Sequence, residues 1–330
     1  MSDSMVVGLD VGGTSTRVAV VSLAGERLGA GRAGGGNPTS HGAEAAAAQL
    51  RAALSEALAA VDPGLVRAAA IGLAGGGRLA ADPASRSAFD RVWHDVGLRC
   101  PYTLVGDQLA AYASATAAPE GTVLVAGTGA IASQVRDFVL YRTADGHGWL
   151  LGDAGSGFWL GREAVRRTLS ELDGHRDPTL LSRLVLSEFL GSPRPASAPR
   201  ATVDALIQAV TRRPPVALAA LAPLVVRAYE AGDETAAAIL AEAARLLTES
   251  VARIRPPDAH TPIVLAGGLL TGGTPLAAAV EESLRSRWPH APRLAAGDGA
   301  VGAAWLAART LPEVPDPVEL HRRLLGRPTG

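Results

Sequence analysis

Three glycine-rich turns, each placed directly after a short apolar run, constrain this chain more than any other feature. The three pairs of run and turn are Met5–Leu9 with Gly12-Gly13, Thr122–Ala126 with Gly127-Thr128-Gly129, and Ile263–Ala266 with Gly267-Gly268. Glycine has no Cβ and reaches positive φ, so such turns let the backbone approach a ligand closely. Successive N–H groups in them can form an anion-binding nest. A single turn of this kind is ordinary in a hairpin, but three of them favour a fold that handles phosphates.

The pattern around these turns predicts an α/β fold with mixed β-sheets flanked by helices. After the first turn a second apolar run follows at 18–21 and a weaker one at 27–32, which is typical of a β-meander. Further along, short apolar strands alternate with segments of helical periodicity, and this alternation is typical of α/β domains. The expected helices cover residues 43–60, 83–96, 108–116, 161–172, 218–227, 234–254, 275–287 and 299–310.

A repeated unit indicates two domains. The arrangement of strand, glycine turn and strand at the start of the chain returns around Gly127, and 330 residues suit two domains. We therefore expect an N-terminal domain over residues 1–118 and a C-terminal domain over residues 119–330, with the last helix packing back on the N-terminal domain. The proline-rich stretch 191–215 has three interpretations that stay open: an interface, a lid or a passive insertion.

The charge balance excludes some classes of partner. The chain has 31 basic and 32 acidic residues and a net charge of −1, which gives no electrostatic basis for binding nucleic acid or an anionic membrane. We expect a small-molecule substrate. All the basic residues are arginines, so there is no Walker-A lysine and no Schiff-base lysine. Phosphate chemistry must then use backbone N–H groups, arginines, carboxylates and a metal.

Cysteine usage and hydropathy indicate a cytoplasmic protein. Cys100 is the single cysteine, which excludes an internal disulfide and fits a reducing compartment. The first residues lack the basic region of a secretory signal. The longest uncharged run, 259–280, is interrupted by glycine and proline, so we interpret it as a strand, a loop and a helix.

Asp10 adds a carboxylate to the first glycine turn. Beside phosphates a carboxylate is useful when a cation lies between them, usually Mg²⁺; the alternative is an aspartate that caps the turn. Thr14 and Thr128 offer hydroxyl donors in the first and second turns. Arg17 can contact a phosphate or form a structural ion pair on the second strand.

The motifs and their order resemble those of the ASKHA superfamily, which includes actin, sugar kinases and Hsp70. The segments 10–17 (DVGGTSTR), 126–129 (AGTG) and 265–268 (LAGG) correspond to its phosphate-1, phosphate-2 and adenosine motifs. The resemblance covers residues 5 to 310. It implies two actin-like (ribonuclease H-like) domains with ATP in a cleft between them, and closure on binding. The implied ATP-contacting residues are Asp10, Gly12, Gly13, Thr14, Arg17, Gly127, Thr128, Gly129, Gly267 and Gly268, with Asp10 holding Mg²⁺ through water.

Within this superfamily the chain resembles the N-acetylglucosamine kinase group of the BadF/BadG/BcrA/BcrD ATPase-like family. The similarity lies in Asn37, Gly75-Gly76, Asp107 after Gly106, and the run 146–157 with Asp153. The resemblance implies that Asp107 is the base on the sugar hydroxyl, and that Asn37, Gly75, Gly76 and Asp153 contact the sugar. His147 and Trp149 are further candidates for sugar binding. The structural alternatives are a helix cap for Asp107, loop capping for Asp153, and loop packing for His147 and Trp149.

One departure from that group bears on the substrate. Those kinases carry a polar residue shortly after the second phosphate turn, where this chain has Ala130-Ile131-Ala132. The segment 152–161 also resembles actinobacterial glucosamine kinases, so we predict phosphorylation of glucosamine to glucosamine 6-phosphate. The alternatives are an N-acetylglucosamine kinase and a non-kinase ATPase of the same superfamily. The family further implies a homodimer.

Overall fold

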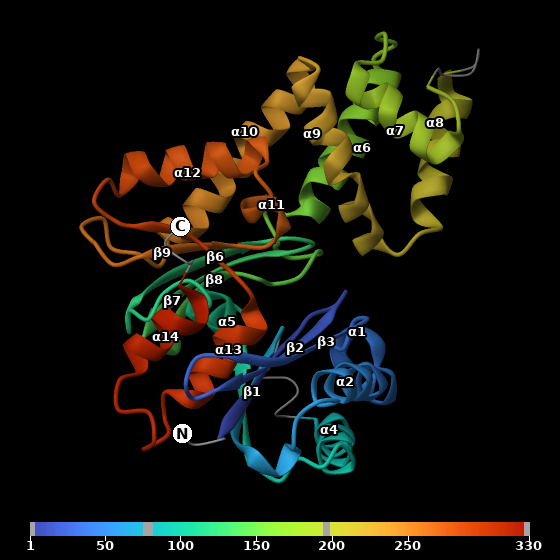
Figure 1. Cartoon of the computed structure of the whole chain (residues 1–330). Helices are drawn as coiled ribbons and strands as arrows, with labels where there is room; N and C mark the ends of the chain where they lie inside the picture. The colour runs from blue at the N-terminus through green and yellow to red at the C-terminus, as the bar shows by residue number, and fades with distance from the viewer. Residues whose placement is uncertain (1–3, 75–81, 194–198, 327–330) are drawn as a thin grey trace. The chain divides into compact units, whose positions relative to one another are not determined.

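The computed structural model describes residues 4–74, 82–193 and 199–326, and these fall into two compact units (Figure 1). Unit 1 comprises residues 1–123, 135–140 and 294–330, and unit 2 comprises 124–134 and 141–293. The end of the chain therefore belongs to the same unit as its beginning. The domain boundary predicted between residues 118 and 119 stays a prediction.

Unit 1 is built on a five-stranded mixed sheet with the order β3-β2-β1-β4-β5. Its strands are β1 (Met5–Val11), β2 (Thr16–Ser22), β3 (Arg27–Ala33), β4 (Val66–Leu73) and β5 (Tyr102–Gly106). The first three strands pair antiparallel, which confirms the predicted meander. β4 pairs parallel with both β1 and β5, so the carboxyl ends of three strands meet at one edge.

The two faces of this sheet are covered by different helices. α2 (Ala43–Ala57) and α4 (Pro83–Asp95) contribute to one apolar core with β1, β2 and β4. On the opposite face α13 (Gly299–Ala308) packs against β1 so closely that a Cβ at Gly8 would lie 2.0 Å from the Ala300 carbonyl oxygen (Figure 1). All ten residues of α13 are buried, as expected of a helix that is apolar on all sides. The other helical segments in the described part of this unit are α1 (Pro38–His41), η1 (Pro63–Leu65), α5 (Asp107–Ala113) and α14 (Pro317–Leu325).

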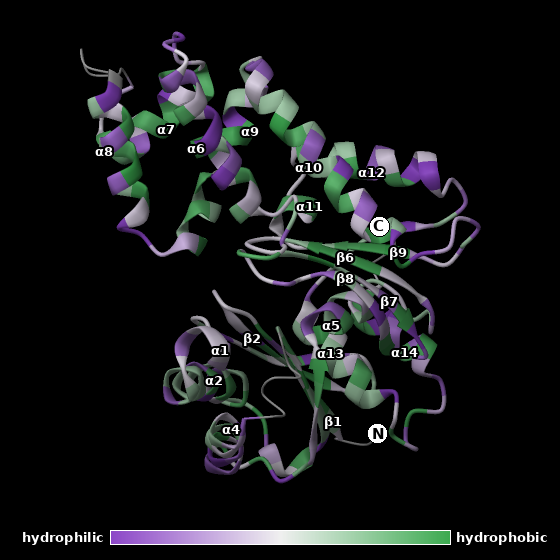
Figure 2. Ribbon diagram, turned by 180° about the vertical axis from the view of Figure 1, so that it is seen from behind, coloured by the Kyte–Doolittle hydropathy of each residue, from purple (hydrophilic) through white to green (hydrophobic). Residues whose placement is uncertain are grey.

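The second sheet has the order β10-β9-β6-β7-β8. Its strands are β6 (Gly121–Ala126), β7 (Ala130–Arg136), β8 (Val139–Asp145), β9 (Ile263–Ala266) and β10 (Arg293–Ala295). Figure 2 shows β6 and β9 as the most hydrophobic part of this sheet, and all four residues of β9 are buried. The helical segments of unit 2 are α6 (Gly157–Asp173), α7 (Leu180–Leu190), α8 (Pro199–Thr211), η2 (Pro215–Leu221), α9 (Ala222–Glu230), α10 (Glu234–Ala252), α11 (Gly268–Thr271) and α12 (Pro275–Arg287).

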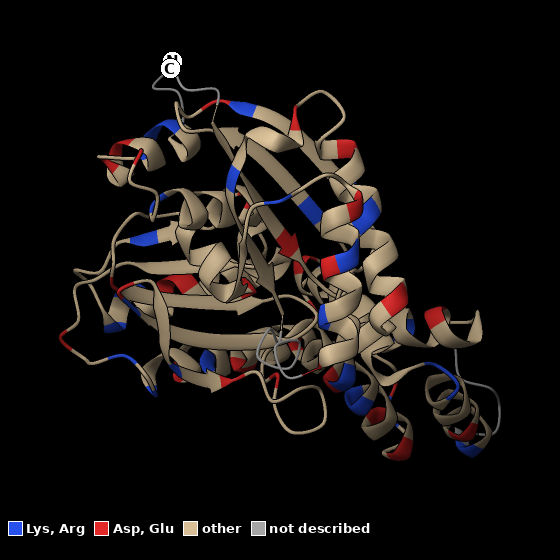
Figure 3. Cartoon of the chain, turned by 90° about the horizontal axis from the view of Figure 1, so that it is seen from below, with Lys and Arg blue, Asp and Glu red and all other residues tan. Residues whose placement is uncertain are grey.

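Charged residues are interspersed over the surface, and the helices carry both signs (Figure 3). Several pairs are three or four residues apart on one helix, such as Arg245 with Glu242, a spacing that brings side chains together. In the described ranges no single helix is long and apolar enough to cross a membrane. One pair, 200–211 and 215–230, meets the length and composition criteria only jointly and is bent by 111°.

Candidate active site

Asp10 lies at the end of β1, beside the tight turn that leads into β2. The Gly12 N–H donates to the Ser15 carbonyl oxygen at 2.9 Å, and Gly13 and Thr14 are exposed at the tip. The Asp10 side chain is 19% exposed and forms an ion pair with Arg17, its register partner on β2. Burial raises the pKa of Asp10, the Arg17 guanidinium lowers it in part, and the charge of Asp298 raises it further.

The start of α13 approaches this carboxylate closely. A Cβ on Gly299 would lie 2.6 Å from Asp10 Oδ2, so glycine lets the helix begin beside Asp10. The preceding residue, Asp298, caps α13 by accepting from the Ala300 N–H at 3.1 Å, and it also accepts from Arg27 Nη2 at 2.8 Å. Sequence reasoning did not single out Asp298, although an aspartate directly before an apolar helix is a recognisable N-cap signal.

Asp107 is the first residue of α5, directly after β5. Gly106 is the N-cap residue and makes no side-chain capping bond, so Asp107 is not the helix cap of the alternative interpretation. Burial, followed by the negative charge of Asp10, raises the pKa of Asp107 to about 6, against the lowering effect of the Gln108 and Asp107 N–H groups. A carboxyl group with that pKa is ionised at neutral pH yet readily takes up a proton.

Strand register explains why Asp10 and Asp107 influence each other. Asp10 pairs with Gly72 on β4, and Gly72 pairs with Val105 on β5, two residues before Asp107. Neighbouring strands lie about 4.8 Å apart. The two carboxylates therefore stand at the same edge of the sheet, with Gly72 of β4 between their strands. The parallel arrangement of β1, β4 and β5 thus builds the cluster.

Asn37 is buried and joins the start of α1 to the end of β4 at this edge. Its Oδ1 accepts from the Thr39 N–H at 2.9 Å and caps α1, while its Nδ2 donates to the Ala74 carbonyl oxygen at 3.1 Å. The preceding glycines pack against the first turn, where Gly36 N–H donates to the Gly12 carbonyl oxygen at 3.2 Å. Asn37 therefore has a structural function, and among the described residues the second N–H of its amide group has no partner. Gly75 and Gly76 lie outside the described residues.

The second glycine turn of the chain, which lies in unit 2, rests on the start of α6. Gly127 N–H donates to the Gly129 carbonyl oxygen at 2.9 Å, and the carbonyl oxygens of Gly127 and Thr128 accept from the N–H groups of Gly157 and Phe158 at 2.8 and 3.1 Å. Thr128 is exposed. The first N–H groups of α6 thus hold the turn in place, and the helix begins at Gly157, four residues before the predicted start.

Asp153 and Asp145 organise the loop that follows β8. Asp153 accepts from the Ala130 N–H at 3.1 Å, next to the second glycine turn, and a Cβ on Gly129 would lie 2.8 Å from its Oδ1. Burial raises the pKa of Asp153, the Ala130 N–H opposes this, and the charge of Asp145 adds to it. The loop-capping interpretation of Asp153 describes this contact, and its predicted sugar contact stays a prediction.

Asp145 was missed by the sequence analysis. It is 8% exposed, and its carboxylate accepts from three backbone N–H groups: Gly146 at 2.8 Å, Asp153 at 2.6 Å and Ala154 at 2.8 Å. A Cβ on Gly152 would lie 2.2 Å from Asp145 Oδ1. The only available signal was an aspartate before glycine at the end of a strand, which is common in turns.

His147 and Trp149 lie on the same loop with exposed side chains. The Trp149 ring meets Phe158 edge-on at 5.8 Å, and Leu150 and Leu151 beside it are 70% and 78% exposed. Loop packing therefore covers part of the indole, and Trp149 remains 38% exposed.

The third glycine turn has a backbone requirement of its own. Gly267 has φ +86°, and a Cβ there would lie 2.2 Å from the Ala126 carbonyl oxygen at the end of β6. Gly268 begins α11 with open space around it. Gly267 brings the third turn against the strand that carries the second one.

The fold and these turns define the class of protein, an actin-like sugar kinase fold. The chain is similar to the structure of a putative N-acetylglucosamine kinase from Chromobacterium violaceum, with 27% identity, a TM-score of 0.71, and coverage of 93% of this chain and 99% of that one. It also shares the fold of a ROK family glucokinase from Streptomyces griseus in complex with glucose and AMPPNP, at 22% identity and a TM-score of 0.58, over 93% and 100% of the two chains. The predicted fold class is confirmed.

The family is shown by the sequence. The BadF/BadG/BcrA/BcrD ATPase family matches residues 7–307, so the chain belongs to that family. A curated relative, the N-acetyl-D-glucosamine kinase of Dictyostelium discoideum, is 25% identical over 93% of this chain and 98% of its own length. An N-acetylmuramic acid/N-acetylglucosamine kinase of Clostridium acetobutylicum is 27% identical over 74% of this chain and 78% of its own length. The predicted family is confirmed, whereas the closer resemblance to glucosamine kinases stays a prediction.

Proposed function

We propose that this chain transfers the terminal phosphoryl group of ATP to the 6-hydroxyl of an amino sugar. The broader class is established by relatives that cover nearly the whole chain: it is an ATP-dependent sugar kinase, a phosphotransferase with an alcohol group as acceptor. The position on the sugar, the identity of the sugar and the roles of single residues are proposals.

The observation that carries the proposal is the Asp107 carboxyl group with its pKa of about 6. Phosphoryl transfer to an alcohol needs a group that orients the hydroxyl and accepts its proton. Asp107 is held at the start of α5, and burial, followed by the charge of Asp10, makes its carboxylate a better proton acceptor than an ordinary aspartate. We assign Asp107 as the base.

Asp10 and the glycine turns are the proposed sites for the nucleotide. Mg²⁺ is commonly held by one or two carboxylates, with phosphates and water completing its shell. Asp10 has a partly exposed carboxylate beside the turn 12–14, which fits such an ion and would neutralise phosphate charge. In the described part of the chain no three metal-binding side chains gather, so the fit is to a mostly hydrated ion. Residues Gly127–Gly129 and Gly267-Gly268 are the proposed contacts of unit 2 with ATP.

The sugar contacts that we propose are neutral, acidic or aromatic. Within the described ranges Asn37 has a second amide N–H without a partner, Asp153 offers a carboxylate, and Trp149 is 38% exposed. An uncharged sugar is recognised through hydrogen bonds to its hydroxyls and packing on apolar ring faces, and these groups suit it. His147, exposed on the same loop, is a further proposed contact.

Two amino sugars are candidates, each favoured by a different observation. The names of the curated relatives favour N-acetylglucosamine, which we place first. Free glucosamine is favoured by the absence of a polar side chain at Ala130–Ala132, where Ala130 and Ala132 are 4% and 0% exposed. A homodimer and a cytoplasmic location remain expectations.

A coupled assay of ADP release tests the proposal with N-acetylglucosamine, glucosamine, glucose, mannosamine or no sugar. We expect turnover that depends on one amino sugar, with a 6-phosphate product identified by NMR. Turnover with glucosamine alone would reverse our order of candidates and keep the enzyme class. Turnover that is equal without any sugar would refute the kinase proposal and favour a non-kinase ATPase, and the roles of Asn37, Asp107 and Asp153 would be withdrawn.

A further inference from the structure

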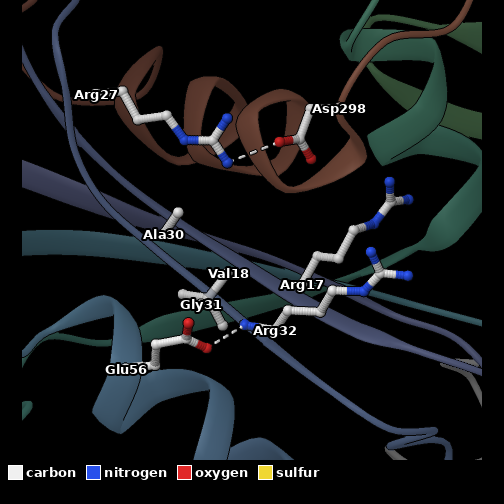
Figure 4. A pocket seen from close by; sticks show the side chains of 8 residues that line it. All are labelled: Arg17, Val18, Arg27, Ala30, Gly31, Arg32, Glu56 and Asp298. Atoms are coloured by element: carbon white, nitrogen blue, oxygen red, sulfur yellow. Dashed lines mark hydrogen bonds and ion pairs between the residues drawn. The ribbon is translucent and has the colours of Figure 1, made fainter.

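An open cavity of about 200 Å³ in unit 1 is lined by three arginines (Figure 4). Arg17 comes from β2, and Arg27 and Arg32 come from β3, the edge strand of the sheet. The acidic residues of the cavity are Glu56 at the end of α2 and Asp298 at the start of α13. A share of about 30 Å³ for each water in the liquid means that the cavity can hold an oxyanion and several waters.

Strand register places two of these arginines side by side. Asp10, Arg17 and Arg32 are register partners across β1, β2 and β3, so they form one row on one face of the sheet. Figure 4 shows the side chains of Arg17 and Arg32 running in parallel, with their guanidinium groups adjacent. Like charges directly opposite each other on neighbouring strands are destabilising. The pair is therefore an arrangement that an anion would stabilise.

The charges of the row do not cancel. Arg17 is paired with Asp10, and Arg27 donates to Asp298 at 2.8 Å. The guanidinium of Arg32 has no hydrogen-bond or ion-pair partner among residues 4–74, 82–193 and 199–326; Glu56 accepts from its backbone N–H at 2.8 Å and not from its side chain. One exposed guanidinium thus stands beside a second one without a counter-ion of its own.

A simpler explanation is that Arg32 protects an exposed sheet edge, because charged side chains on edge strands prevent pairing with other chains. The helix beside β3 already covers this edge. Glu56 accepts from the Arg32 N–H, and Gln49 of α2 accepts from the Gly34 N–H at 2.8 Å. Two edge donors are satisfied by α2, so protection of the edge does not require the charge of Arg32.

We propose that Arg17 and Arg32 form a binding subsite for a phosphoryl group on the edge strand of unit 1. Guanidinium groups present planar forks of donors that match phosphate oxygens and bind them through two parallel bonds. The subsite begins beside Asp10 and the first glycine turn, and it offers the Arg32 guanidinium to a phosphate in a chain that has no lysine. Three sources share this chemistry: inorganic phosphate, a sugar phosphate and a nucleotide. The proposal does not rest on the kinase function.

The test is calorimetric titration of the full chain with inorganic phosphate at constant ionic strength. The variants are Arg32→Gln and a matched control, Arg51→Gln. Arg51 lies on α2 of the same unit. Its ion pair with Asp95 is exposed, so removing that pair should change stability little. Because charge-assisted hydrogen bonds are the stronger ones, we expect Arg32→Gln to weaken phosphate binding about tenfold and Arg51→Gln to leave it unchanged. A melting curve with phosphate gives a second readout, since a bound ligand stabilises the folded state.

Titrations with glucosamine 6-phosphate and with ADP assign the source. If Arg32→Gln loses affinity for the sugar phosphate alone, the subsite belongs to that ligand. A loss of affinity for ADP alone assigns the subsite to the nucleotide, and a loss of affinity for inorganic phosphate alone assigns it to the free anion. The proposal is overturned if Arg32→Gln binds all three as the wild type does, or if Arg51→Gln weakens binding equally. Binding is measured without turnover, so failure here leaves the kinase proposal standing, and failure of that proposal leaves this result intact.

Discussion

Asp107 of unit 1 and Asp145 of unit 2 are both largely buried aspartates, but the protein surrounds them differently. Asp145 receives three backbone N–H groups on its carboxylate. Asp107 is buried near the like charge of Asp10, and its pKa is raised to about 6. Hydrogen bonds that favour the charged form stabilise a carboxylate, whereas burial and a like charge favour its protonated form.

The difference separates a scaffold from a reactive group. A carboxylate that is fully bonded to backbone donors fixes a loop, and Asp145 fixes the loop that carries Asp153, His147 and Trp149. A carboxylate kept short of favourable contacts costs stability and gains proton affinity, which is useful in catalysis. Neutralising Asp145 should therefore lower the stability of the folded protein, and neutralising Asp107 should raise it.

The largest effect is expected on turnover when Asp107 is neutralised. Asp107→Asn keeps the shape of the side chain but cannot accept the proton, so we expect a fall in kcat of about 10²-fold or more. Steady-state kinetics with the sugar identified in the panel measure it, and circular dichroism checks the fold. Asp95→Asn, an exposed aspartate of the same unit, is the matched control and should retain activity. Near-wild-type turnover of Asp107→Asn would remove its assignment as the base.

The next effect is a loss of stability on neutralising Asp145. In Asp145→Asn the side-chain oxygen can serve two of the three N–H groups, and the amide NH₂ then faces the third donor, so we expect a destabilisation of about 2–3 kcal/mol. Asp153→Asn keeps its one acceptor oxygen for Ala130 and should lose less than about 1 kcal/mol. Both residues have positive φ, 65° and 58°, which asparagine tolerates. Denaturant unfolding measures both, and equal losses would contradict the scaffold function of Asp145.

A smaller effect of opposite sign is expected on stability when Asp107 is neutralised. Its pKa in the folded state, about 6, lies above the value of 3.8 for an unperturbed aspartate, so the folded state binds more protons between these values and stability is lost as pH rises through 6. Asp107→Asn lacks this loss. We expect it to exceed the wild type by about 1–2 kcal/mol at pH 7–8 and to match it near pH 3. Urea unfolding at several pH values measures the difference in unfolding free energy between Asp107→Asn and the wild type. A difference that stays constant with pH would show that the raised pKa of Asp107 is not its cause.

The sequence predicted the framework of unit 1 because its strands are continuous apolar runs that end at glycine turns. Asp10 and Asp107 could be predicted as well, since each follows such a run directly. β8 was missed because its apolar run, Val139-Leu140-Tyr141, is short and is followed by the polar pair Arg142-Thr143. α14 was missed although Asp316 caps it and Pro317 begins it, which are ordinary helix-start signals.

The rest of the candidate site depends on contacts that no local pattern contains. Asp145 fixes its loop through N–H groups up to nine residues away. Asp298 matters to the site because its charge raises the pKa of Asp10, which lies near the other end of the chain. The pairing of Arg17 with Arg32 follows from the register of β2 and β3, which a meander predicts only to within a residue or two. Register and tertiary packing, and not residue type, decided these positions.

The smallest predicted effect separates the two causes of the Asp107 pKa. Burial is the larger cause and the charge of Asp10 the second, so Asp10→Asn should lower the pKa of Asp107 while leaving it above the ordinary value. Carboxyl NMR titration of the free protein measures this directly. In the wild type, kcat/KM should rise with pH through about 6 as Asp107 loses its proton. Asp82→Asn, at an N-cap of the same unit, should leave the Asp107 titration unchanged. If Asp10→Asn also leaves the Asp107 titration unchanged, burial is the cause that raises the pKa, and the contrast with Asp145 reduces to how far backbone N–H groups offset burial at each residue.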